Sequence, residues 1–127
     1  MDARTDPLGS EVEIRMAASP AWIPVARSVA ERLASRANFD RDATDDVRLA
    51  VDEACTAVAN QTAAGATLTC TFDVGPGRIV VEVSGDAADD PAPFETLAWR
   101  ILRAVTDELS LRHQPGHRFT IRLAKHM

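Results

Sequence analysis

The chain has little of what marks secreted, metal-binding or membrane proteins. It contains two cysteines, Cys55 and Cys70, and three scattered histidines, which make neither a disulfide framework nor a recognisable set of metal ligands. No apolar run approaches the ~20 residues of a membrane helix, and residues 1–10 lack the charged and then apolar build of a signal peptide. We therefore expect a cytoplasmic protein with two reduced thiols, no metal and no membrane attachment.

Basic residues are outnumbered by acidic ones. The chain has 14 Lys and Arg against 19 Asp and Glu, which gives a formal net charge of −5. Nucleic acids and anionic membranes are bound through a basic stripe, so we expect neither as a partner. The length of 127 residues fits one domain, which we place at residues 11–127 after a flexible tail over residues 1–10.

Hydrophobic periodicity divides the domain into strands and helices. Apolar residues alternate with polar ones in the strands and recur three or four positions apart in the helices. The predicted strands are 11–16, 67–72, 78–83, 109–112 and 119–123, and 85–93 is a predicted loop. The element order β-α-α-β-β-α-β-β, with hairpin pairing, predicts an α+β fold. This fold is a two-layer sandwich of a mostly antiparallel sheet with helices on one face.

Each predicted helix has an expected boundary and an expected buried stripe. The first is capped by Ser19, although Pro24 fits only a first turn, so that the regular helix can begin there. The second is capped by Asp42 or Thr44 and runs to about Asn60, and the third spans 94–106. The expected inward residues are Val25, Val29 and Leu33 in the first helix, Val47, Val51, Ala54 and Val58 in the second, and Leu97, Ile101, Leu102 and Val105 in the third.

The second helix carries the most specific motif. Residues 45–58 read DDVRLAVDEACTAV, which resembles the L-A-V-x-E-A-x-T-N-A signature of the bacterial anti-sigma factor and serine-protein kinase family, a branch of the GHKL ATPase superfamily. The resemblance runs from about Glu11 to the end of the chain and implies that family's histidine-kinase-like ATPase fold. It places Glu53 at the family's general base or water-positioning glutamate. Ala57 takes the place of the asparagine that binds the magnesium of ATP.

The nucleotide-binding boxes depart from the family pattern. The family's D-x-G, which reads the adenine, falls on Gly85, Asp86 and Ala87, so that Asp86 is one residue out of register. The glycines of the family's ATP lid fall on Thr96 and Ala98, which do not give a phosphate cradle the backbone freedom that glycine allows. The chain therefore resembles an actinobacterial-type member of the family with degenerate nucleotide-binding boxes.

Weak candidates for a nucleotide site remain. Asn60 lies one helical turn beyond Ala57, and Asp86 lies beside the family's aspartate position. We expect no cofactor, with ATP and Mg²⁺ bound only if the chain is an active kinase in which Glu53 is catalytic. In an inactive protein Glu53 is a solvated or cap-linked acid, and Trp99 is expected to fill the space that ATP would have taken.

The resemblance also implies partners. The family's first helix carries an arginine that contacts both the sigma factor and its antagonist, and Val25-Ala26-Arg27 is similar to that stretch. We therefore predict that Arg27, with Ser28 and Glu31 nearby, contacts a partner; the alternative is an ordinary surface arginine. The family dimerises through its first strand and first helix. The open edge of residues 11–16 accordingly predicts a homodimer.

Two functions of different classes remain open. The first is a binding module for stress-response transcription control: an anti-sigma factor that sequesters an alternative RNA polymerase sigma factor. This anti-sigma factor would be released by a competing anti-anti-sigma (STAS-domain) protein, by partner switching and without a kinase reaction of its own. The alternative is an active ATP-dependent serine kinase that phosphorylates the anti-anti-sigma factor. A degenerate ATPase domain that serves as a scaffold for another partner is a third possibility.

Overall fold

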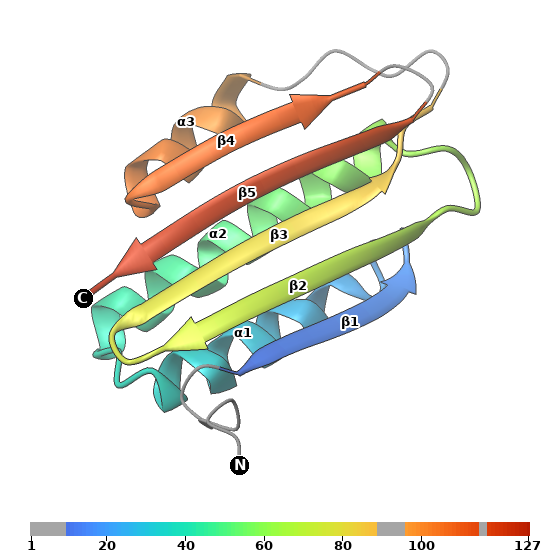
Figure 1. The fold of residues 1–127 in the computed structure, drawn as a ribbon. Helices are drawn as coiled ribbons and strands as arrows, with labels where there is room; N and C mark the ends of the chain where they lie inside the picture. The colour runs from blue at the N-terminus through green and yellow to red at the C-terminus, as the bar shows by residue number, and fades with distance from the viewer. Residues whose placement is uncertain (1–9, 89–95, 115–116) are drawn as a thin grey trace.

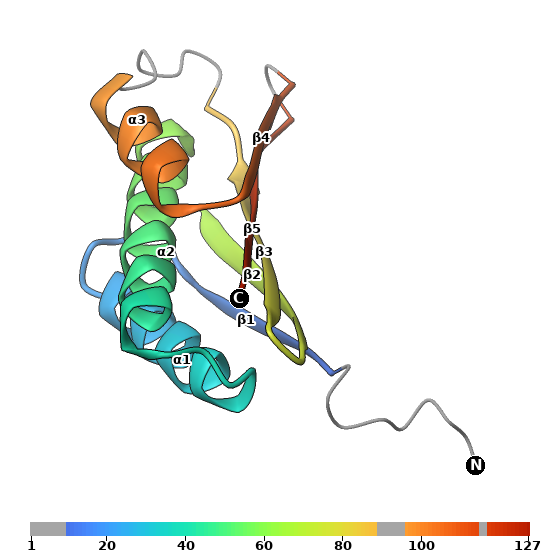
Figure 2. The same cartoon turned by 90° about the vertical axis from the view of Figure 1, so that its left-hand side faces the viewer.

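Three helices cover one face of a five-stranded antiparallel sheet in the computed structural model, which describes residues 10–88, 96–114 and 117–127 (Figure 1). A view turned by 90° shows all three helices on the same side of the sheet (Figure 2). The helices are α1 (Ile23–Arg36), α2 (Arg41–Gln61) and α3 (Thr96–Val105). The strands are β1 (Glu11–Ala17), β2 (Thr67–Gly75), β3 (Arg78–Asp86), β4 (Glu108–His113) and β5 (Arg118–His126). The predicted two-layer α+β architecture and element order are confirmed.

The five strands form one continuous sheet. Its strands follow the order β1-β2-β3-β5-β4, so that β1 and β4 lie at the edges. β2 and β3 form a hairpin that turns through Gly77, whose φ of 66° lies in the left-handed region that glycine adopts at little cost. The sheet face under the helices is built from fully buried residues such as Leu68, Val83 and Ile121. This face and the inner sides of the helices form one hydrophobic core.

Helix α2 is the central helix of the covering layer. Its predicted stripe is confirmed, since Val47, Val51, Ala54 and Val58 are all buried. Its N-cap is Asp40, whose Oδ1 accepts a hydrogen bond from the Ala43 N–H at 2.8 Å, so the prediction of Asp42 or Thr44 was wrong. Asp42 instead lies in the first turn, where its charge complements the helix dipole.

Helix α1 begins later than its first candidate cap. Ser19 makes only a turn, in which its Oγ accepts from the Ala21 N–H at 3.3 Å, and the helix starts at Ile23 with Pro24 in its first turn. Its buried face consists of Ile23, Ala26, Ala30, Leu33 and Ala34. The predicted stripe was therefore wrong at Val25, which is 45% exposed. The alanines of α1 are buried and Val29 packs against the core, so the buried face is centred away from Val25.

Helix α3 packs beside α2 and next to β4, at the margin of the helical layer (Figure 1). Leu102 is fully buried and Val105 packs against the core, as predicted. Leu97, which was also predicted to face inward, is 61% exposed. Because α3 sits at the margin of the helical layer, a residue on its far side has no described element to pack against. The predicted start of this helix at residues 94 and 95 lies outside the described residues.

Candidate functional site

The carboxyl end of α2 is tied to the end of β3, the region where the family's nucleotide boxes should meet. Thr62 and Ala87 form an isolated antiparallel bridge. The Ala63 N–H donates to the carbonyl of Asp86 at 3.2 Å, and the Ala88 N–H donates to that of Gln61 at 2.9 Å. The loop predicted from residue 85 therefore begins later, because β3 continues through Asp86 and is held by these backbone bonds.

Gly85 leaves no space for a side chain. A Cβ at this position would lie 2.4 Å from Cγ2 of Thr62 and 3.3 Å from Cδ2 of Leu68. The methyl group of Thr62 is held there because its hydroxyl donates to the Ala59 carbonyl at 2.9 Å. In the family pattern this is the place of the aspartate that reads adenine. In this chain a threonine methyl fills the space that such a carboxylate would need.

Asp86 points to the other side of the sheet. Side chains alternate along a strand, so Asp86 lies on the face opposite to that of Gly85. It is exposed, and its Oδ1 lies 3.5 Å from Nη1 of Arg118, its partner in the β3–β5 register. Arg118 also donates to the hydroxyl of Ser84 at 2.6 Å. Asp86 is thus separated from α2 by the sheet and belongs to a polar surface network.

The signature helix offers few oxygen atoms beside Gly85. Ala57 is 6% exposed and belongs to the core, where its methyl group provides no metal ligand. Glu53 is half-buried and takes part in an interaction, whereas Asn60 is exposed. Among the described residues, no three His, Cys, Asp or Glu side chains are grouped so that they could hold a metal ion. In nucleotide sites Mg²⁺ is held by one or two side-chain oxygens together with phosphates and water, and Ala57 provides no such oxygen at its position.

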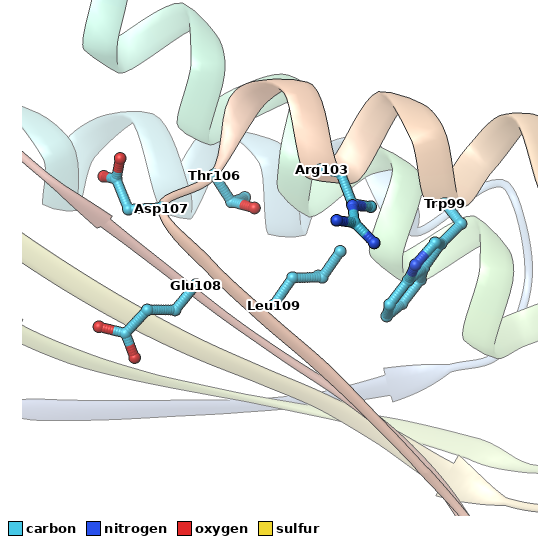
Figure 3. Close-up of a pocket in the computed structure, with 6 residues that line it drawn as sticks. All are labelled: Trp99, Arg103, Thr106, Asp107, Glu108 and Leu109. Atoms are coloured by element: carbon cyan, nitrogen blue, oxygen red, sulfur yellow. The ribbon is translucent and has the colours of Figure 1, made fainter.

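Trp99 lies between α3 and β4. It is half-buried, packs against the core and lines a pocket of about 260 Å³ (Figure 3). The residues that line this pocket are Trp99, Arg103, Thr106, Asp107, Glu108 and Leu109. Neither Ala57 nor Gly85 is among them. That Trp99 fills a former nucleotide space remains a prediction, and its described surroundings are those of the β4 edge.

The residues predicted to contact a partner are engaged within the fold. Arg27 is half-buried, and its Nη1 lies 3.2 Å from Oδ1 of Asp52 on α2. Glu31 lies 3.7 Å from Nε of Arg48, also on α2, while Ser28 is exposed. Both charged residues therefore bridge the two helices. Sequence reasoning did not find these pairs, because nothing in the local pattern specifies how α1 crosses α2.

The two cysteines lie in contact. Both are fully buried, and the Sγ atoms of Cys55 on α2 and Cys70 on β2 are 3.7 Å apart. The hydrogen bond to Cys70, together with burial, raises the pKa of the Cys55 thiol well above its ordinary value. The same hydrogen bond lowers the pKa of Cys70, whereas burial opposes that change. The contact therefore holds the proton on Cys55 and makes Cys70 the thiol of the pair that ionises more readily.

The comparisons with known proteins agree with this fold. Residues 16–125 match the histidine kinase-like ATPase domain family. The chain belongs to this family. It is 33% identical over 104 residues to the anti-sigma-F factor RsbW of Mycobacterium tuberculosis, in both the CDC 1551 and the H37Rv strain. The matched region covers 80% of this chain and 61% of each relative, so the chain spans about three-fifths of their length.

A solved structure supports the same assignment at the level of fold. The RsbW and RsbU domains of Rv1364c from Mycobacterium tuberculosis superpose with a TM-score of 0.69 at 14% identity, over 92% of this chain and 32% of that one. The family resemblance read from the second helix is therefore confirmed, as is the histidine kinase-like ATPase fold. No described helix of this family member combines the length and apolar character needed to span a bilayer.

Proposed function

We propose that the chain is an anti-sigma factor without a kinase reaction of its own. It would sequester an alternative sigma factor of RNA polymerase in the cytoplasm and release it when an anti-anti-sigma (STAS-domain) protein competes. The two relatives at 33% identity, both named anti-sigma-F factors, support the binding function. The filled space at Gly85 carries the second part, because it removes the adenine-reading position of the family.

Two separate features of the site oppose a kinase reaction. A carboxylate at position 85 would collide with Thr62, and the helix offers Ala57 where a magnesium ligand is needed. Either change alone would weaken nucleotide binding. Together they affect both the base and the metal-bound phosphates, so no single substitution restores the site.

A kinase that phosphorylates the anti-anti-sigma factor is the second candidate. One observation favours it: Glu53, the family's catalytic glutamate, is retained on α2 and half-buried at the matching position. In that case Asn60, one turn along the helix, would have to take over the contact with magnesium. Its displacement along the helix axis makes this the weaker of the two functions.

Calorimetry with Mg–ATP separates the two candidates. We expect no binding heat at tens of micromolar protein, and none for Ala57→Asn either, because Thr62 still fills the space at Gly85. A dissociation constant in the low micromolar range for the unmodified chain would instead establish the kinase. Affinity capture from native extract tests the sigma-factor part, since recovery of no sigma factor would favour a scaffold for another partner.

Homodimerisation through β1, beyond which the described residues form no further strand, is part of the same proposal. Backbone groups at an unpaired edge are ready to pair with a second strand. Light scattering should then report about twice the 13.7 kDa of the chain. A monomer at tens of micromolar would exclude a stable dimer.

A further inference from the structure

The β4 edge presents unpaired backbone groups next to apolar side chains. The Gln114 N–H donates to the Arg118 carbonyl at 3.0 Å, in the register of the whole β4–β5 ladder. Bonded and non-bonded pairs alternate in an antiparallel ladder, so the N–H and C=O groups of Leu109, Leu111 and His113 point away from β5. In the part of the chain that the structure describes, no strand lies beyond β4.

An incompletely covered seam runs between β4 and α3. Leu111 is paired with the buried Ile121 and therefore lies on the helical side of the sheet, yet it is 38% exposed. Trp99, Arg103 and Leu109 point toward one another across the seam (Figure 3). A strand added to β4 would turn every second side chain into this seam, beside the indole and the two leucines.

Acidic and basic side chains around the seam differ in whether they have a partner. Asp107 accepts a hydrogen bond from the His126 backbone N–H at 2.7 Å, and Glu108 lies 3.6 Å from Arg122. In contrast, Arg103 on the rim of the seam and Arg100 one turn before it have no ion-pair partner among the described residues. The acidic groups of this edge are thus engaged, and the exposed cations of α3 are available to a partner.

We propose that the β4 edge and the seam beside it bind an extended, acidic segment of a partner protein, which adds to the sheet as a sixth strand. Backbone pairing with Leu109, Leu111 and His113 would provide affinity. The apolar seam would select small or branched side chains at every second position, and Arg100 and Arg103 would select acidic residues. This inference goes beyond the proposed function because it does not require the partner to be a sigma factor.

The other edge of the sheet does not fit the same ligand. The Val74 N–H donates to the Ser10 carbonyl at 3.1 Å, which by the same alternation places the free backbone groups of β1 at Glu11, Glu13 and Arg15. Two of these three residues are acidic and would repel an acidic strand. The charge around the two edges therefore assigns the acidic segment to β4.

A synthetic peptide tests the proposal directly. The probe is an acetylated and amidated heptapeptide of alternating Glu and Val with Glu at both ends, and the same peptide with Lys in place of Glu is its control. Trp22→Phe, which removes an exposed tryptophan, leaves Trp99 as the only indole reporter. We expect the acidic peptide to shift the emission of Trp99 to the blue. It should also slow amide exchange at Leu109, Leu111 and His113 at least threefold.

Two variants separate backbone pairing from other effects. Leu111→Pro removes one outward-pointing N–H without removing a bond to β5, which an edge strand tolerates, and should abolish binding. Leu111→Ala keeps the N–H and should weaken binding by no more than about tenfold. Unchanged melting of both variants shows that the fold is intact, and if Leu111→Pro unfolds the chain, the exchange pattern of the unmodified protein decides.

Charge reversal completes the test. Arg100→Glu/Arg103→Glu should weaken binding of the acidic peptide roughly 10- to 100-fold, whereas the matched reversal Arg32→Glu/Arg36→Glu on the exposed side of α1 should not. Equal binding of the acidic and basic peptides would overturn the proposal. So would no protection of the β4 amides at millimolar peptide, or protection at β1 instead.

Discussion

Two groups of arginines in this molecule are used differently. On the α1–α2 side, Arg27 is paired with Asp52 at 3.2 Å, and Arg48 is paired with acids on both helices. On α3, Arg100 and Arg103 have no ion-pair partner among the described residues. The arginine that a family comparison singles out thus helps to join two helices, whereas the two exposed arginines of α3 form no such pair within the described ranges.

The carboxyl end of α2 and the α3–β4 edge differ in how completely they are packed. At the carboxyl end of α2, Thr62 and Gly85 fit so closely that not even a methyl group can be added. At the α3–β4 edge, Leu111 is 38% exposed although its partner Ile121 is buried. The end of α2 is thus closed to a larger side chain, whereas the β4 edge leaves apolar surface exposed.

The largest expected effect comes from filling the space at Gly85. Gly85→Ala should lower the free energy of unfolding by about 1–3 kcal/mol, because the new Cβ would overlap with Cγ2 of Thr62 and press on Leu68. Without that overlap the substitution would stabilise the protein slightly, since alanine has less freedom in the unfolded chain and Gly85 has no positive φ. Urea unfolding of the two proteins measures the difference.

A double-mutant cycle with Thr62→Ser shows whether the methyl group is the cause. Serine keeps the hydroxyl that bonds to Ala59 and lacks Cγ2. Gly85→Ala should therefore cost clearly less in the Thr62→Ser background. An equal loss of stability in both backgrounds would show that the methyl group of Thr62 does not close this region. The difference in packing between this region and the β4 edge would then be unsupported.

Much of the fold could be predicted from the sequence because it depends on local patterns. The buried stripe of α2, from Val47 to Val58, follows from helical spacing, and the alternating strands follow from period two. The predicted inward face of α1 was wrong at Val25, which is exposed, while the neighbouring alanines are buried. Pattern reasoning ranks valine above alanine as a core residue. Close helix packing reverses that order, and this is a property of two helices together.

Less of the candidate site than of the fold could be predicted from the sequence. The departures at Ala57 and Gly85 could be read by aligning motifs, but that Thr62 fills the space at Gly85 depends on how α2 ends against β3. The contact between Cys55 and Cys70 likewise joins a helix to a strand 15 residues away. Such contacts are set by tertiary geometry, which the spacing of residues along the chain does not specify.

The cysteine contact predicts how stability should change at alkaline pH. The pKa of Cys55 is raised in the folded protein, so above an ordinary pKa of 9.0 the unfolded chain loses this proton while the folded protein keeps it. The folded state then binds more protons, and the free energy of unfolding should fall as pH rises, by up to about 1.4 kcal/mol per pH unit for one proton. Below pH 8 it should be independent of this group.

Urea unfolding between pH 7 and 10 checks this expectation, with Cys55→Ala/Cys70→Ala as the control for other alkaline groups such as Lys125. In the control, the free energy of unfolding should change with pH without the contribution of the thiols, whatever the stability of this variant at neutral pH. An identical slope in both proteins would contradict a net contribution of the pair, because the raised pKa of Cys55 and the lowered pKa of Cys70 would then cancel.

The smallest expected effect concerns the arginine that the family resemblance singles out. Arg27 and Asp52 have side chains that are 38% and 31% exposed, and their ion pair spans α1 and α2. Pairs exposed to this degree typically contribute about 0.2–1 kcal/mol after screening by solvent. Arg27→Ala and Asp52→Ala, combined in a double-mutant cycle, should give a coupling energy in that range, and Arg103→Ala should leave the free energy of unfolding unchanged within about 0.5 kcal/mol.

Binding then decides which group of arginines serves a partner. If the sigma factor docks on α1, Arg27→Ala should weaken binding far more than it lowers stability, because the partner would have to draw Arg27 away from Asp52. If docking uses the α3–β4 edge, Arg103→Ala should weaken binding while Arg27→Ala changes only the helix pairing. Melting curves and titrations of these two variants with one captured partner distinguish the surfaces. A residue that acts only within the fold lowers stability, but it does not weaken binding as long as the variant remains fully folded.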